Sequence, residues 1–196
     1  MTTIRRSLCL LVVLAGAALA VEPIVLVDFE EAAKATPLLK VRHPKAELST
    51  EQASQGKASL KMAFEKYEPG KPEWPMVSIP LGQAGLPKDW SSARFWAFDV
   101  FTPLAEGCVL RSLVNNEDKR EWYQGHPVPP GKWTTIYIDL RGVAASVDLK
   151  SLARMAFYMT RPPADTIIYL DNVRLLPPTT ESPDAVKLSL VSPSFH

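Results

Sequence analysis

The segment Ile167–Leu175 places the tightest constraint on how this chain can fold. Its apolar residues predict a buried β-strand near the end of the chain, and the pair Asp171-Asn172 interrupts that strand. A carboxylate buried without a partner costs roughly several kcal/mol. We therefore expect Asp171 to have a specific partner elsewhere in the sequence.

The candidate partner lies in an early apolar segment, Val25–Glu30. If the first and last strands are neighbours, Glu30 and Asp171 can share a cation. Two alternatives need no metal: Asp171 caps a turn, or it pairs with an arginine such as Arg174.

The rest of the chain is a series of short apolar or alternating runs separated by turn residues, including 18 prolines. These runs predict roughly ten strands and an all-β sandwich, with no strand–helix alternation. Leu38–Leu48 is expected to form one poorly defined strand. Asp148–Leu152 is expected to form a short helical turn.

The strongest single strand prediction is Arg94–Phe101. Its alternation places Trp96, Phe98 and Val100 in the core and Asp99 on the other face. Trp133, in a later alternating segment, is expected to pack in the core or against a loop rather than to bind a ligand.

The first twenty residues have the features of a secretory signal. Arg5 and Arg6 precede the apolar run Leu8–Leu19, and Ala18-Leu19-Ala20 is a cleavage signal of small residues. Cleavage after Ala20 predicts a secreted or periplasmic protein. The predicted divisions are a signal at 1–20, a β-sandwich domain at 21–176, and a linker with the start of a truncated segment at 177–196.

Charge and cysteine content narrow the possible partners. The chain has 22 lysines and arginines against 21 acids, and losing Arg5 and Arg6 leaves a net charge of −1. This balance argues against nucleic acid or a membrane surface as a partner. Only Cys108 remains after cleavage, so no internal disulfide is possible, and its expected role is a small buried apolar residue.

The sequence contains no motif for a known catalytic centre. Glu117 and Glu121 flank a charged turn and could be imagined as a glycosidase acid and base, but a solvated loop is the expected role. The histidines His43, His126 and His196 are scattered. We therefore predict a non-enzymatic domain.

Four segments together resemble carbohydrate-binding-module jelly rolls of the galactose-binding-domain-like superfamily. They are Val27–Glu30, the turn and strand Gly56–Leu60, the turn Pro130–Thr134, and the closing Tyr169–Leu175. Such modules are often attached to agarases and other glycoside hydrolases. The resemblance implies an all-β jelly-roll sandwich of two antiparallel sheets over about residues 24–176.

The resemblance also implies a structural Ca²⁺. In such modules the ion often lies between the first strand, a carbonyl of the early glycine turn and the closing aspartate. Carried over to this sequence, the ligands are Glu30, a backbone oxygen near Lys57, and Asp171, with Asp28 as a weaker candidate. Oxygen ligands of this kind suit Ca²⁺ rather than Zn²⁺.

Sugar-contacting residues have to be chosen from the side chains themselves. Sugars stack on aromatic rings, and polar side chains hold their hydroxyls. Trp74 and Trp90 are candidates because they lie in predicted loops, and one of the adjacent Trp122 and Tyr123 must point outward. The predicted ligand-binding residues are Arg111, Asn115, Trp122, Tyr123, His126 and Tyr158.

The predicted function is a non-catalytic carbohydrate-binding module of an exported protein, accessory to a glycoside hydrolase. The partner is a polysaccharide or oligosaccharide, with a possible catalytic domain after the module in the same chain. The first alternative is a structural or interaction domain that binds no sugar, and a glycosidase or polysaccharide lyase is a weaker one.

Overall fold

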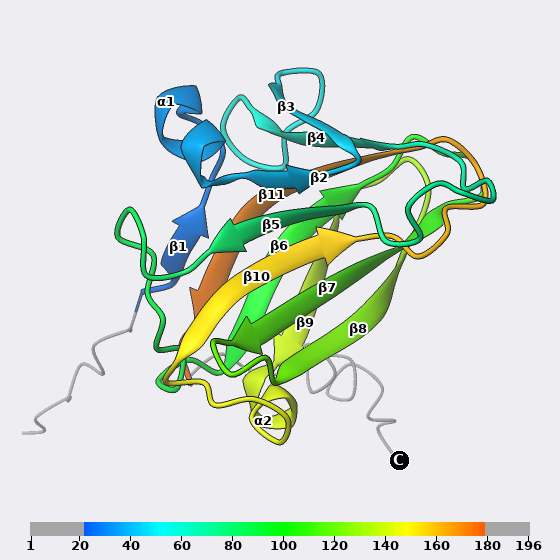
Figure 1. Ribbon diagram of the computed structural model, residues 1–196. Coiled ribbons are helices and arrows are strands. Elements are labelled where there is room, and N and C mark those ends of the chain that lie inside the picture. The colour runs from blue at the N-terminus through cyan, green and yellow to red at the C-terminus, as the bar shows by residue number, and fades with distance from the viewer. Residues whose placement is uncertain (1–21, 179–196) are drawn as a thin grey trace, which may run out of the picture.

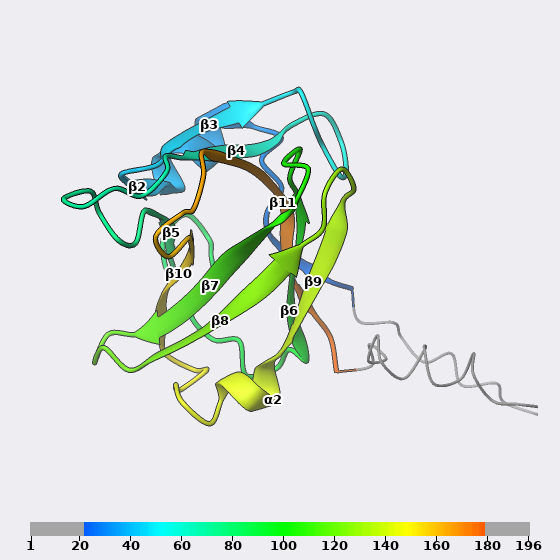
Figure 2. The ribbon, with the colours of Figure 1, turned by 90° about the vertical axis from the view of Figure 1, so that its right-hand side faces the viewer.

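The computed structural model describes residues 22–178, which form two antiparallel β-sheets packed face to face (Figures 1 and 2). One sheet has six strands in the order β3-β4-β11-β6-β9, with β1 also paired to β11. The other has five strands in the order β2-β5-β10-β7-β8. The predicted all-β jelly-roll sandwich is confirmed.

The strands of the six-stranded sheet are β1 (Ile24–Val27), β3 (Lys45–Ser49), β4 (Ser59–Phe64), β6 (Phe95–Phe101), β9 (Thr134–Asp139) and β11 (Thr166–Leu176). The strands of the five-stranded sheet are β2 (Lys40–Arg42), β5 (Met76–Pro80), β7 (Cys108–Asn116), β8 (Glu121–Val128) and β10 (Leu152–Tyr158). Two short α-helices, α1 (Ala32–Ala35) and α2 (Leu140–Val143), and a 3₁₀ turn, η1 (Thr36–Leu38), complete the described elements.

Strand β11 is central, and three strands pair with it. Its first half pairs with β4, its second half with β1, and its other edge with β6. The first and last strands are therefore neighbours, which is the condition set for Glu30 and Asp171 to share a cation. The Asp171-Asn172 interruption is a β-bulge: the register with β6 shifts between Asp171 and Arg174, and Asn172 has a φ of 50°.

The bulge reverses which side chains of β11 face the core. Ile168 and Leu170 before it, and Val173 and Leu175 after it, all join the main hydrophobic cluster. Without the extra residue, the period of two would turn the last two residues away from the core.

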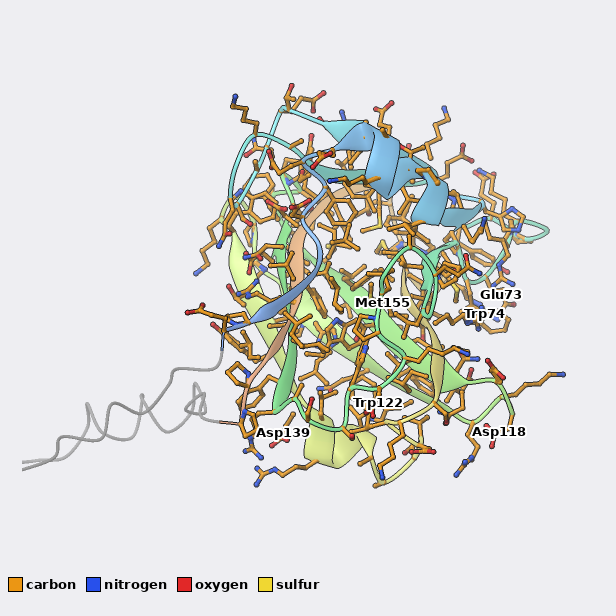
Figure 3. The ribbon with its side chains drawn as sticks, turned by 90° about the vertical axis from the view of Figure 1, so that its left-hand side faces the viewer. Glu73, Trp74, Asp118, Trp122, Asp139 and Met155 are labelled. Carbon is orange, nitrogen blue, oxygen red and sulfur yellow. The ribbon has the colours of Figure 1, made fainter. Side chains whose placement is uncertain are left out.

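The core between the sheets is built from the inward residues of both. Trp96 and Phe98 on β6 pack against Phe157 on β10, with ring centroids 5.7 and 5.0 Å away. Met155 lies in the same layer (Figure 3). The predicted inward face of Arg94–Phe101 is confirmed. Of the two kinds of packing expected for Trp133, the structure shows the one outside the core: Trp133 is half-buried just before β9 and packs on Phe101.

The prediction of one strand over Leu38–Leu48 is wrong, because the segment contains two strands in different sheets. His43, with a φ of 78°, and Pro44 turn the chain between β2 and β3. The short β2 then pairs with β5, and β3 pairs with β4.

The predicted helical turn at Asp148–Leu152 is also wrong, since this segment forms a turn that leads into β10. The helix lies earlier, at α2. Its N-cap is Asp139, whose side chain accepts a hydrogen bond from the backbone N–H of Arg141.

The predicted signal peptide at 1–20 lies outside the described residues, as does the segment 177–196 apart from its first two residues. Within 22–178, no helix has the length and apolar character needed to cross a membrane.

Candidate functional site

The register of the five-stranded sheet aligns side chains from all its strands on the outer face. Arg42, Met76, Tyr158, Arg111 and Gly125 form one row across β2, β5, β10, β7 and β8. The next row toward the other end of the sheet contains Ser78, Ala156, Leu113 and Tyr123. On the middle strands β5 and β10, the side chains between these rows, Val77 and Phe157, lie in the core, so the rows face away from it.

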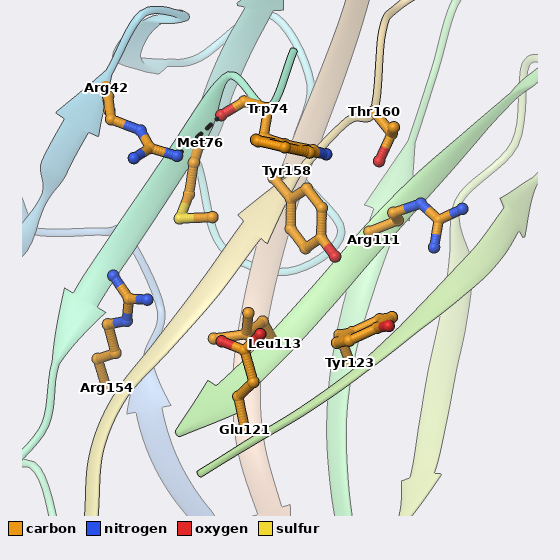
Figure 4. A pocket seen from close by; sticks show the side chains of 10 residues that line it. All are labelled: Arg42, Trp74, Met76, Arg111, Leu113, Glu121, Tyr123, Arg154, Tyr158 and Thr160. Carbon is orange, nitrogen blue, oxygen red and sulfur yellow. Dashed lines mark hydrogen bonds between the residues drawn. The ribbon is translucent and has the colours of Figure 1, made fainter. Parts of the chain in front are cut away.

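This outer face carries a hollow of about 530 Å³, which we call the sheet hollow (Figure 4). It is lined by Arg42, Trp74, Met76, Arg111, Leu113, Glu121, Tyr123, Arg154, Tyr158 and Thr160.

Apolar side chains form the floor of the sheet hollow. Met76, Leu113, Ala156 and Tyr158 make up a hydrophobic cluster separate from the main core. Trp74 and Tyr123 stand above it and are 51% and 56% exposed. Trp74 lies in the loop before β5, at the edge of the molecule in Figure 3. Exposed aromatic rings over an apolar floor suit the C–H face of a sugar.

The polar side chains of the hollow are mostly basic. The Arg42 guanidinium donates to the backbone carbonyl of Trp74 at 3.3 Å, and Arg154 Nε donates to Asn115 Oδ1 at 3.0 Å. Burial raises the pKa of the Tyr158 phenol, and the nearby charge of Arg111 opposes that rise. Among the described lining residues, Glu121 is the one acid.

The structure brings four of the six predicted ligand-binding residues to this face. Arg111, Tyr123 and Tyr158 line the sheet hollow. Asn115 shares their face and orients Arg154.

Trp122 and His126 point the other way, into the sandwich. Trp122 packs against the main core (Figure 3), because strand alternation sends its neighbour Tyr123 outward. His126 is buried; its Nε2 lies 2.8 Å from the Ser112 hydroxyl, and its ring meets Phe98 edge-on. Neither side chain can touch a ligand in the sheet hollow.

Several lining residues were not among the predicted ones. Arg154 was recognisable from the alternation that also marks Tyr158. Arg42 was hidden by the misread segment Leu38–Leu48. Trp74 is a candidate from its loop position alone, since a loop has no periodic pattern that shows where a side chain points. Trp90, the other loop tryptophan considered, is fully buried and donates to the carbonyl of Pro87.

The predicted metal ligands Glu30 and Asp171 do not line the sheet hollow, and each contacts the loop 54–58. The Glu30 carboxylate accepts from the backbone N–H groups of Lys57 and Ala58, which lower its pKa. It also lies where a side chain at Gly56 would be, since a Cβ there would stand 2.3 Å from Glu30 Oε1. Lys57 therefore contacts Glu30 through its backbone N–H, whereas the predicted metal ligand was a backbone oxygen near Lys57.

Asp171 meets the other end of the same loop. Its Oδ2 accepts from the backbone N–H groups of Ser54 and Gln55 at 2.8 and 3.1 Å, which is the turn-capping alternative. Burial raises the pKa of this carboxyl, and these hydrogen bonds partly offset the rise. Arg174 pairs with Asp99 instead of Asp171.

The loop 54–58 and the two acids that contact it offer some, but not all, of the oxygen ligands that Ca²⁺ needs. Two carboxylates from distant strands reach one short loop, and carboxylate oxygens are the ligands that Ca²⁺ prefers. Among residues 22–178, no group of three or more His, Cys, Asp and Glu side chains is placed to hold a metal. Backbone carbonyl oxygens would have to complete the coordination.

The two acids considered as a glycosidase pair, Glu117 and Glu121, do not face each other across a common site. Glu117, on the turn between β7 and β8, forms an ion pair with Lys88, whereas Glu121 faces the sheet hollow. Cys108 is half-buried at the start of β7.

No protein-family model and no curated protein sequence matches the chain. Solved structures do match. An exo-β-agarase matches with a TM-score of 0.67 and 16% identity, over 81% of this chain and 25% of that one. The chain thus spans about a quarter of that agarase, and the same holds for a second agarase.

Two separate modules match over nearly their whole length. The family 11 carbohydrate-binding module of a cellulosomal cellulase of Clostridium thermocellum has a TM-score of 0.62 and 14% identity, over 81% of this chain and 96% of that one. A family 22 xylan-binding domain from Paenibacillus barcinonensis has a TM-score of 0.55 and 18% identity, over 84% and 100%. The chain therefore has the β-sandwich fold of carbohydrate-binding modules and of one part of agarases.

Proposed function

We propose that this chain is a non-catalytic carbohydrate-binding module of an exported protein and that it assists a glycoside hydrolase domain. The observation that carries the proposal is the sheet hollow, where exposed Trp74 and Tyr123 stand over an apolar floor beside hydrogen-bond donors. Support also comes from the matching family 11 module, which has been solved with a β-1,3-1,4-mixed-linked tetrasaccharide. An open site with few aromatic rings suits weak binding, with a Kd of ~1 mM to ~1 μM.

The two rival functions have less support. A purely structural domain needs no exposed rings, yet Trp74 and Tyr123 are more than half exposed. A glycosidase needs two carboxyl groups facing each other across the substrate. Among the described residues of the sheet hollow, Glu121 is the one acid.

We expect Trp74→Ala and Tyr123→Ala each to weaken glycan binding about tenfold, because each removes a stacking surface. Affinity electrophoresis against a panel of polysaccharides measures the change. Both side chains are exposed, so melting should shift little. Tyr137→Ala is the matched control, since this tyrosine is 41% exposed on β9 of the other sheet.

Two results would count against this proposal. Retardation of the parent by a glycan, with both variants retarded equally, would move the site away from the sheet hollow. Absence of retardation by every glycan tested would remove the binding function.

We also propose that Ca²⁺ binds at the loop 54–58 and stabilises the closure of the sandwich. Glu30 and Asp171 would supply carboxylate oxygens. Support comes from their convergence on one loop and from the desolvation of Asp171, since a bound cation would favour its charged form.

Removing Ca²⁺ should therefore lower the melting temperature. An ion at 100 times its Kd stabilises the native state by about 2.7 kcal/mol, which corresponds to about 5–10 °C here. Differential scanning calorimetry with EDTA, and then with excess CaCl₂, measures the shift. Asp171→Asn should lose the response, and Glu31→Gln, an exposed acid paired with Lys34, should keep it. Identical melting curves with and without EDTA would show that hydrogen bonds alone hold the loop.

A further inference from the structure

We propose that the glycan held in the sheet hollow is anionic, with sulfate ester or carboxylate groups that bind Arg42, Arg111 and Arg154. This inference rests on the proposed carbohydrate-binding function and specifies its ligand class.

The first support is the distribution of ion pairs. Residues 22–178 contain eight arginines. Five of them have a carboxylate within 4.0 Å: Arg94, Arg120, Arg141, Arg161 and Arg174. The three with no such partner among the described residues are Arg42, Arg111 and Arg154, and all three line the sheet hollow. The fold thus gathers its uncompensated guanidinium groups in one place.

The second support is the way these arginines are held. They come from β2, β7 and β10, so the sheet register fixes their spacing. Arg42 and Arg154 each use one donor on a neighbour, the Trp74 carbonyl and Asn115. A guanidinium has five N–H donors, so each keeps donors for a ligand. The planar fork of arginine binds carboxylate and sulfate-like oxygens in pairs.

Arg111 is the one of these three arginines that lines two hollows. It lies opposite Gly125 on β8, which has no side chain to cover it. Arg111 and Thr160 also line a second hollow of about 610 Å³ next to the first. A chain that crosses both hollows passes Arg111.

A neutral glycan is the rival ligand, since guanidinium groups also donate to hydroxyls. Glu121 separates the two cases, because it is the one acid among the described residues of the hollow. With a neutral ligand, its carboxylate serves as a hydroxyl acceptor, and losing its charge weakens binding. With an anionic ligand it repels, and losing its charge strengthens binding.

The test compares a sulfated galactan with the same polymer after chemical desulfation, a polyuronate, and neutral agarose and xylan. Titration calorimetry on the whole chain is run at low and at 0.5 M NaCl. We expect the sulfated polymer or the polyuronate to bind at least about tenfold more tightly than the neutral polymers at low salt, and to lose most of that advantage at high salt. Tighter binding of the sulfated galactan would identify sulfate as the bound group, and tighter binding of the polyuronate would identify carboxylate.

Variants add a readout that a structural defect would not produce. Arg111→Gln should remove most of the preference for the charged polymer, whereas Glu121→Gln should tighten binding to it about threefold. Arg141→Gln on α2 changes the net charge equally and should have no effect. Equal, salt-independent binding of charged and neutral glycans, or weaker binding by Glu121→Gln, would overturn the anionic ligand and leave the module function standing. Absence of binding to every polymer would overturn both.

Discussion

Asp99→Ala is expected to lower the free energy of unfolding by about 3–5 kcal/mol, because it leaves a buried charge without its counter-ion. The Asp99 carboxylate accepts four hydrogen bonds, from Ser54, Thr135, Asn172 and Arg174. Its side chain is 9% exposed, and that of Arg174 is 14% exposed. Urea titration measures the loss, and the melting temperature should fall by about 10 °C.

Two further variants separate the unpaired charge from loss of the side chain itself. Asp118→Ala breaks an exposed ion pair with Arg120, and its effect should stay within about 0.5 kcal/mol. Adding Arg174→Met to Asp99→Ala should recover part of the stability, because no buried charge is then left unpaired. A loss below about 1 kcal/mol for Asp99→Ala would show that water replaces the carboxylate.

Strand β11, which carries Asn172 and Arg174 of the Asp99 network, shows which features can be predicted from the sequence. The apolar character of Ile167–Leu175 was enough to predict a buried strand, and its acid, Asp171, correctly indicated a specific partner, which is the backbone of Ser54 and Gln55. The shared-cation hypothesis required β1 and β11 to be neighbours, and the two strands do pair. The bulge was not predictable, because two alternating registers fit the sequence equally well until the pairing with β6 is known.

The candidate site shows the same division between periodic and irregular segments. Arg111 and Tyr158 lie in long strands whose alternation fixes the outward face, and both reach the sheet hollow. Between the adjacent Trp122 and Tyr123, alternation required one inward side chain but could not say which. Trp74 lies in a loop, where no period operates. Where a loop side chain such as Trp74 points depends on how segments distant in the sequence pack together, which the local sequence does not show.

Stability should also depend on pH through His126. Burial lowers the pKa of His126 from 6.5 to about 4. Between these values the unfolded chain binds a proton that the folded chain does not, so stability is complete above pH 6.5 and falls as the pH falls. The loss should be about 2 kcal/mol between pH 7 and pH 5 and about 3 kcal/mol at pH 4.

Urea titrations at pH 7 and pH 5 give the free energy of unfolding at each pH. The difference between these two free energies removes any effect of a substitution that is the same at both pH values. His126→Gln should reduce that difference by about 2 kcal/mol, because glutamine does not titrate. His43→Asn removes an exposed histidine and should keep the parent's difference, since asparagine tolerates the positive φ of this turn. The ring of His126 contacts Ser112 and Phe98 rather than a carboxylate, so no ion pair compensates its protonation. An unchanged difference in His126→Gln would mean that the protonated ring reaches water without unfolding.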